Sequence, residues 1–251
     1  MKPACNFPKL PHKYDRALRE AVSFVLERLR PIGIIAAGTI VRGTPDAASD
    51  LDVWVIHPTP VRQRLQKFFN GVPAEIFVNP PWVIRKYFVQ DQGEARPISA
   101  HMMATGTVVL ATDPVVEELR QTAISLVSSS PTVTPQKLTE ARYAAATKLE
   151  DAMDILERHP ATANMLLSEA VRQMLQFAFM QAGRFIPRDK DLLDALTNLD
   201  SDLGSKVRLF FESADWTRRM QLATELADRI LQVRGFFEWS SEPEEVPPPT
   251  G

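Results

Sequence analysis

Two aspartates separated by one residue, Asp50 and Asp52, stand where an apolar run begins. Side chains two positions apart on a β-strand project to the same face, so both carboxylates would point to one side with their Cα atoms about 6 to 7 Å apart. Magnesium takes oxygen ligands and is commonly held by one or two carboxylates together with substrate phosphates. The pair therefore predicts a site for a divalent cation, although acids that simply face water are common in half-exposed strands.

A third acid, Glu75, interrupts the apolar run 74–78. If this run forms a strand beside the one that holds Asp50 and Asp52, the three carboxylates meet and Glu75 completes a triad. An acid on an edge strand can instead face water. The prediction of a triad therefore depends on which strands are neighbours in the sheet.

The hexapeptide that begins at Gly38 reads Gly-Thr-Ile-Val-Arg-Gly and follows a predicted strand. A glycine lets a phosphate approach the backbone, and the hydroxyl of Thr39 and the N–H groups of a helical turn can face that phosphate. The guanidinium of Arg42 offers two parallel donors to phosphate oxygens, with an ion pair to a nearby acid such as Asp46 as the alternative. We place Ser49, which directly precedes the aspartates, in the same nucleotide-binding group.

The combination resembles the DNA polymerase β-like nucleotidyltransferases, whose motif is a Gly-Ser turn, an acid-hydrophobic-acid strand and a third acid on a neighbouring strand. The likeness covers residues 32–79 and is nearest to the aminoglycoside nucleotidyltransferase type, in which a helical domain follows. It implies that Asp50 and Asp52 bind the catalytic metal, that Glu75 is the third ligand or the general base, and that the glycine turn holds the triphosphate. Thr39 stands where serine is usual, which keeps the hydroxyl and adds a methyl group.

The resemblance also implies a reaction, the transfer of a nucleoside monophosphate from an NTP to an acceptor hydroxyl in the presence of Mg²⁺. ATP is the expected donor, and a small hydroxylated molecule of the aminoglycoside kind is the first expectation for the acceptor. Two alternatives stay open: a protein acceptor, as for nucleotidyltransferase antitoxins, and a regulatory module that binds nucleotide without turning it over. One catalytic half serves many acceptors, so the residues do not identify the acceptor.

The periodicity around these residues predicts a mixed α/β (α+β) domain over residues 12–127. β-branched and aromatic runs bounded by Gly, Pro, Asp or Asn predict strands over 32–37, 51–56, 74–78 and 107–111. Helical spacing predicts helices over 14–29, 61–70 and 81–90, with another that starts at Pro114.

The composition changes at residues 128–135, where small residues and two prolines indicate a linker. Beyond it, apolar residues at i, i+3, i+4 and i+7 predict a bundle of four or five helices over 136–239, with the active site in the cleft between the two domains. Lys190, after the helix-ending Gly183, is predicted to reach the triphosphate, and the alternative is a surface lysine at a helix start. The Pro- and Glu-rich end, 240–251, is predicted to be disordered.

The charge balance argues against nucleic acid as the partner. The 29 basic and 31 acidic residues give a formal net charge of −2, so no overall field would draw the protein to nucleic acid or to an anionic membrane. Cys5 is the only cysteine, which excludes an intrachain disulfide and a Cys-rich zinc site. We expect a cytoplasmic protein without membrane association, whose partners are an NTP and a hydroxylated acceptor, and the sequence leaves a homodimer open.

Overall fold

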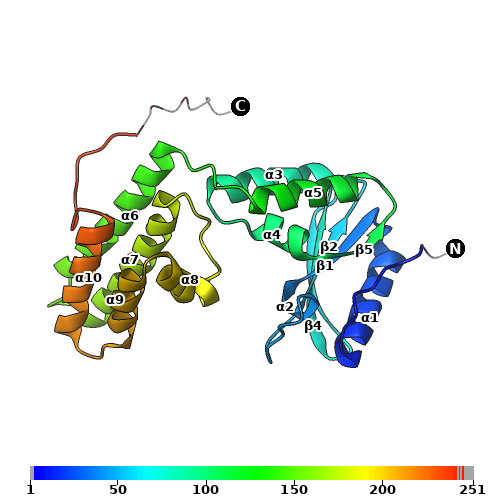
Figure 1. The fold of residues 1–251 in the computed structure, drawn as a ribbon, viewed down its shortest axis with the longest axis horizontal. Helices are drawn as coiled ribbons and strands as arrows, with labels where there is room; N and C mark the ends of the chain where they lie inside the picture. Colours follow the sequence, from blue (N-terminus) through cyan, green and yellow to red (C-terminus); the bar gives the residue numbers. More distant parts are fainter. Residues whose placement is uncertain (1–2, 242, 244, 246–251) are drawn as a thin grey trace. The chain divides into compact units, whose positions relative to one another are not determined.

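The computed structural model describes residues 3–241, 243 and 245. The chain divides into two compact units, Met1–Ser130 and Pro131–Gly251, each with its own secondary-structure elements (Figure 1). The junction falls inside the segment 128–135, and the described residues between Val127 and Pro135 form no helix or strand. Most of the segment 240–251, for which we predict disorder, lies outside the described residues.

The first unit is built on a five-stranded sheet in the order β3-β4-β2-β1-β5. The strands are β1 (Gly33–Ala37), β2 (Leu51–Ile56), β3 (Gln63–Phe69), β4 (Val72–Asn79) and β5 (Thr107–Ala111). β2 and β4 run parallel and the other neighbouring pairs are antiparallel, which confirms a mixed sheet. Along the chain β3 lies between β2 and β4, but in the sheet it lies at the edge, next to β4 only. The chain reverses direction between β3 and β4, so β4 runs in the same direction as β2. The starts of these two strands therefore lie at the same end of the sheet.

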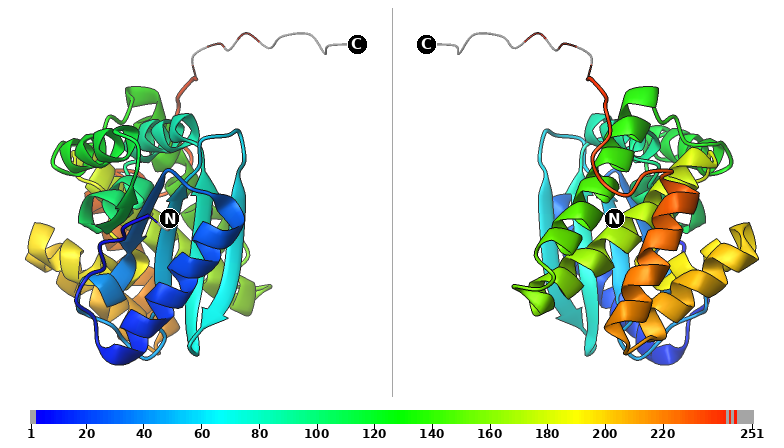
Figure 2. Two further views of the ribbon diagram at one scale, coloured as in Figure 1. Left: turned by 90° about the vertical axis from the view of Figure 1, so that its right-hand side faces the viewer. Right: turned by 90° about the vertical axis from the view of Figure 1, so that its left-hand side faces the viewer.

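Helices cover both faces of this sheet. On one face lies α1 (His12–Leu29), and on the other lie α3 (Pro81–Gly93), α4 (Ile98–Thr105) and α5 (Val115–Val127). The left panel of Figure 2 shows α1 lying across the strands. Val53 of β2 belongs to the core beneath α1, whereas Trp54 belongs to the core beneath the other helices. Since side chains alternate along a strand, Asp52 shares the face of Trp54.

The predicted helix over 61–70 is wrong, because β3 occupies Gln63–Phe69 and pairs antiparallel with β4. Asn70 and Gly71 connect the two strands with φ angles of 46° and 72°. Two successive positive φ angles are typical of the type I′ turn that joins two-residue hairpins, and Asn-Gly is its preferred sequence. The hairpin places β3 at the edge of the sheet beside the strand of Glu75.

The helix α4, which the periodicity did not predict, has its first turn capped by a side chain from α3. The buried carboxylate of Asp91 accepts a hydrogen bond from the N–H of Ala100 at 2.9 Å, and it also accepts bonds from Ser99 and Ile98. Burial raises the pKa of Asp91 to about 6, although these hydrogen bonds act in the opposite direction. Asp91 therefore satisfies N–H groups that the short helix leaves without an intrahelical acceptor.

Replacing Asp91 by alanine should lower the free energy of unfolding of the first unit by about 2 kcal/mol, because buried N–H groups lose their acceptor. The difference from the parent protein should widen as the pH falls from about 6 to about 4. The raised pKa means that the folded state binds a proton more tightly than the unfolded chain, so Asp91 adds stability as it becomes protonated. Urea denaturation across this pH range measures both effects.

The control for this variant is Glu94→Ala, since Glu94 lies on the exposed surface close to Asp91 in sequence. Its unfolding free energy should change by no more than about 0.5 kcal/mol. A deficit for Asp91→Ala that stays constant with pH would contradict the proton linkage.

The second unit is helical throughout its described elements, which confirms the predicted bundle. Its described residues form five α-helices and one 3₁₀ helix: α6 (Pro135–Asp154), α7 (Pro160–Gln181), η1 (Asp189–Asp191), α8 (Leu192–Leu199), α9 (Ser201–Glu212) and α10 (Trp216–Ile230). α7 packs against both α6 and α10, and it buries Leu167, Val171, Met174 and Leu175 at helical spacing. Its apolar stripe therefore supplies much of the core of this unit.

Polar residues fix where three of these helices begin. The side chains of Thr134, Asp200 and Asp215 accept hydrogen bonds from backbone N–H groups in the first turns of α6, α9 and α10. Such caps satisfy donors that an α-helix leaves unpaired at its start.

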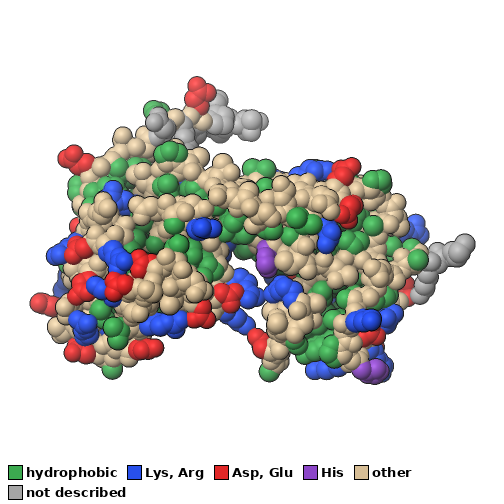
Figure 3. Space-filling view, viewed as in Figure 1, with side chains coloured by type: hydrophobic (Ala, Val, Ile, Leu, Met, Phe, Trp, Pro, Cys, Tyr) green, Lys and Arg blue, Asp and Glu red, His purple; other side chains and the backbone are tan. Residues whose placement is uncertain are grey.

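The surface carries charges of both signs. On the face drawn in Figure 3, Lys and Arg side chains are interspersed with Asp and Glu side chains over the second unit. Within the described part of the chain, no helix combines the length and the apolar character needed to cross a membrane.

Candidate active site

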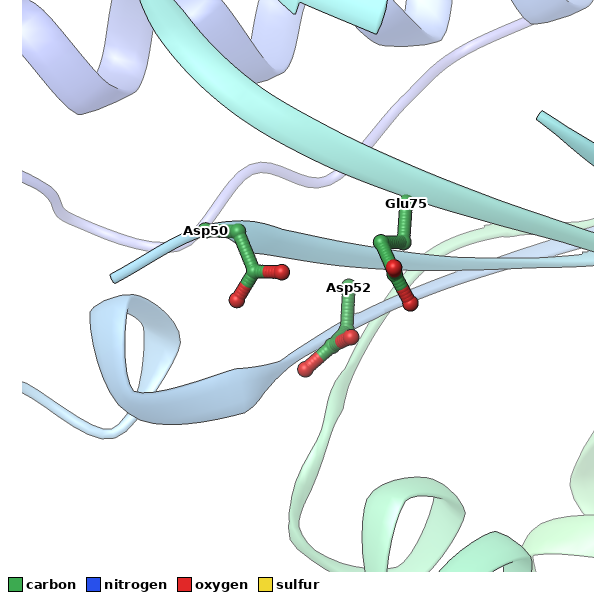
Figure 4. A group of neighbouring side chains, drawn as sticks. All are labelled: Asp50, Asp52 and Glu75. Carbon is green, nitrogen blue, oxygen red and sulfur yellow. The ribbon is translucent and has the colours of Figure 1, made fainter. Parts of the chain in front are cut away.

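The three acids singled out in the sequence come together at one end of β2 and β4. The parallel register places Asp52 directly opposite Glu75, and Asp50 immediately precedes β2. One carboxylate oxygen of each acid lies within 4.8 Å of the others. Figure 4 shows the three carboxyl groups directed to the same side of the two strands. The condition set by the sequence, that the strand of Glu75 neighbours the strand of the aspartates, is met.

The electrostatics of the cluster favour a bound cation. The pKa of Asp52 is raised to about 6, first by burial and then by the charges of Asp50 and Glu75, while Arg42 and Arg64 oppose the shift. A divalent cation among the carboxylates would offset both the burial and the repulsion. Three converging carboxylates are also the oxygen ligands that hard divalent cations prefer. The cluster therefore fits a divalent metal ion.

Gly38 begins the short helix α2 (Gly38–Val41) directly after β1, with a φ angle of 90°. A Cβ atom built on this residue would lie 2.7 Å from Oδ2 of Asp52. Both the backbone conformation and this close approach exclude an ordinary side chain. The glycine thus lets the backbone turn pass directly beside a carboxylate of the acidic cluster.

The hydroxyl groups of Thr39 and Ser49 lie 2.9 Å apart and form a hydrogen bond. Ser49 also donates to the carboxylate of Asp46 at 3.0 Å and accepts from the N–H of Asp46 at 2.8 Å. These bonds join the turn at α2 to the loop that leads into Asp50. The hydroxyl of Thr39 therefore helps to fix the loop that carries the first acid.

The two predicted cationic contacts with the nucleotide belong to different units. Arg42 follows α2, where its N–H donates to the carbonyl of Gly38 at 3.1 Å, and its charge lowers the pKa of Asp52. The field of its guanidinium therefore reaches the acidic cluster. Lys190 lies in η1 of the second unit and has an exposed side chain. The assignment of both residues to the triphosphate stays a prediction.

Two polar side chains that contact the acids were not predicted. Arg64 and Gln66 on β3 both bond to Glu75: Nη2 of Arg64 lies 2.6 Å from Oε2, and Nε2 of Gln66 donates to Oε1. Their alternation over three residues would have indicated a shared strand face, but the segment was predicted as a helix. The Asn-Gly pair that follows it was the signal that could have found them.

The fold is shared with a protein of known structure. The crystal structure of a nucleotidyltransferase-like protein from Exiguobacterium sibiricum 255-15 matches with a TM-score of 0.53 and 14% sequence identity, over 86% of this chain and 73% of that chain. At this identity the likeness establishes the fold alone. Comparisons of the sequence with protein-family models and with curated proteins find no match.

Proposed function

We propose that the protein is a magnesium-dependent nucleotidyltransferase that moves a nucleoside monophosphate from an NTP onto a hydroxyl group of a small acceptor. The proposed donor is ATP, so the group transferred is AMP. The observation that carries the proposal is the convergence of Asp50, Asp52 and Glu75 beside the turn at Gly38. The fold shared with a protein described as nucleotidyltransferase-like supports it. A module that only binds nucleotide would gain nothing from three acids whose mutual repulsion disfavours their charged forms.

In this proposal Asp50 and Asp52 bind the metal, and Glu75 is the third ligand or the base that takes the proton of the acceptor hydroxyl. The hydroxyl oxygen attacks the α-phosphorus in line, a new phosphorus–oxygen bond forms, and the bond to the β-phosphate breaks as pyrophosphate leaves. A bound Mg²⁺ would neutralise charge that develops on the phosphate oxygens. The protein contributes chiefly by holding the reacting groups in line.

The triphosphate is proposed to lie along the turn that follows β1. Gly38 brings this turn directly beside the acidic cluster, and the first turn of α2 has no side-chain cap, so its N–H groups can face an anion. Thr39 and Ser49 add hydroxyl groups, and Arg42 adds a cation whose charge already reaches the acids. Lys190 is proposed as a further contact from the helical unit.

A transfer assay with labelled nucleotide tests this function. With the label on the α-phosphate of ATP, a nucleotidyltransferase moves the label to the acceptor, whereas a kinase leaves it on the released ADP. The acceptors are tested in two arms: small hydroxylated compounds including aminoglycosides, and proteins co-expressed with the enzyme. Label on a small compound supports the proposal, and label on proteins alone would replace its acceptor class. Absence of label from both arms, with all four NTPs, would count against transfer.

Binding of ATP with Mg²⁺ should raise the melting temperature of the first unit. A ligand that binds only the folded state at about 100 times its Kd stabilises that state by about 2.7 kcal/mol. The shift should disappear when EDTA replaces Mg²⁺, and it should be much smaller in Asp52→Asn, whose metal site lacks one carboxylate. Differential scanning fluorimetry measures it, and unchanged melting with every NTP at millimolar concentration would contradict nucleotide binding.

A further inference from the structure

Glu75 is restrained on both of its carboxylate oxygens by the neighbouring strand β3. Arg64 contacts Oε2 at 2.6 Å and Gln66 donates to Oε1. The Glu75 side chain is 19% exposed, and both of its carboxylate oxygens are bonded to these donors. A cation that binds Glu75 must therefore displace one of these donors or share an oxygen with it.

The position of Arg64 is fixed by more than its ion pair. The register of β3 and β4 places Arg64 opposite Phe77 and Gln66 opposite Glu75. The guanidinium carbon lies 5.1 Å from the centre of the Phe77 ring, and that ring is itself stacked on Trp54 with 5.3 Å between centroids. An exposed arginine normally samples many rotamers at little cost. Here the stacked rings hold the charged group beside Glu75 although the Arg64 side chain is 63% exposed.

We infer that Arg64 is a positioning residue that acts as the resident counter-cation of Glu75 and competes with the divalent metal for this carboxylate. The inference rests on the proposed function, because it concerns the same metal site. The consequence is weak metal binding in the absence of nucleotide, so that the metal enters the site together with the triphosphate.

The inference predicts a gain of metal affinity on loss of a side chain. Arg64→Met should bind Mn²⁺ and Mg²⁺ about fivefold more tightly than the parent protein in the absence of nucleotide, the factor expected for removing one unit charge about 4 Å from another in a polar medium. Isothermal titration calorimetry of the full chain with each metal salt measures the affinity directly. Arg64→Lys, which keeps the charge, should stay within about twofold of the parent.

The matched control is Arg62→Met. Arg62 carries the same charge two residues earlier and lies over the ring of Tyr87 at 5.6 Å, but it makes no ion pair with any described residue. This variant removes the same net charge from the same segment without releasing Glu75. The gain in affinity should also be lost when Arg64→Met is combined with Glu75→Gln. In that double variant the metal ion no longer finds the Glu75 carboxylate that the loss of Arg64 would release.

The outcomes separate this inference from the proposed function. If the parent protein binds Mn²⁺ and Arg64→Met binds it no more tightly than Arg62→Met does, the role of Arg64 is overturned while the metal site stands. If Arg64→Lys gains as much affinity as Arg64→Met, the competition by charge is overturned. If the parent protein and both variants bind neither metal even with ATP present, the proposed function fails together with the inference.

Discussion

Asp52→Asn should lose nucleotidyl transfer by about a thousandfold or more and should be at least as stable as the parent protein. The loss corresponds to about 4 kcal/mol of transition-state stabilisation. A metal ion that neutralises charge on the phosphoryl group contributes stabilisation of this size. The stability follows from the site itself. The raised pKa of Asp52 shows that the folded state disfavours its charged form at neutral pH, and asparagine keeps the shape without the charge.

Activity and melting temperature measured on the same samples test this expectation. Asp50→Asn should show a loss of similar size, because the two aspartates share the same cluster. Glu20→Gln is the control, since Glu20 lies on α1, which packs on the opposite face of the sheet, and pairs there with Arg16. Full transfer activity in both aspartate variants would defeat the assignment of the metal site. A large fall in melting temperature would instead indicate that Asp52 is structural.

The acidic cluster was predictable because it depends on local spacing and on one pairing. The alternation of Asp50 and Asp52 fixes a shared face, and the apolar run around Glu75 indicates a buried strand. That the strands of Asp52 and Glu75 are neighbours follows from the family resemblance rather than from the spacing. In the structure these strands are paired, and Asp52 lies directly opposite Glu75.

The strand β3 was missed because its apolar residues fit two periods. Leu65, Phe68 and Phe69 stand at i, i+3 and i+4, which is the spacing of a helical face. In the structure Phe68 is 76% exposed, so it is not part of a buried apolar face. The turn at Asn70 and Gly71 favours a hairpin over a helix. The turn residues therefore carried more information than the apolar period.

The contacts of Arg64 could not be predicted from the sequence once that strand was missed. A helix over 61–70 would place Arg64 and Gln66 on different faces, whereas a strand places both on the face of Glu75. The cap from Asp91 to α4 is a further tertiary contact of this kind, since it joins two helices that no local period relates. Local sequence patterns thus identify the three acids, whereas the side chains that contact them depend on the pairing of strands distant in sequence.

Gly38→Ala should lower transfer by about a hundredfold and the free energy of unfolding by about 1 to 2 kcal/mol. The stability loss arises because alanine is strained at a φ angle of 90°. The activity loss arises because the new Cβ atom would lie 2.7 Å from Oδ2 of Asp52, so that the carboxylate must move. A displacement of about 1 Å in a reacting group can cost about a hundredfold in rate.

Gly43→Ala separates these two effects. Gly43 has a φ angle of 80°, close to that of Gly38, but a Cβ atom there would meet nothing within 4 Å. This variant should therefore show the same backbone strain in urea denaturation and keep transfer within about threefold of the parent, since about 0.6 kcal/mol corresponds to that factor. Metal titration should separate the two variants in the same way, with weaker Mn²⁺ binding in Gly38→Ala alone. Equal losses of transfer in both would mean that the turn conformation, rather than the position of Asp52, limits the reaction.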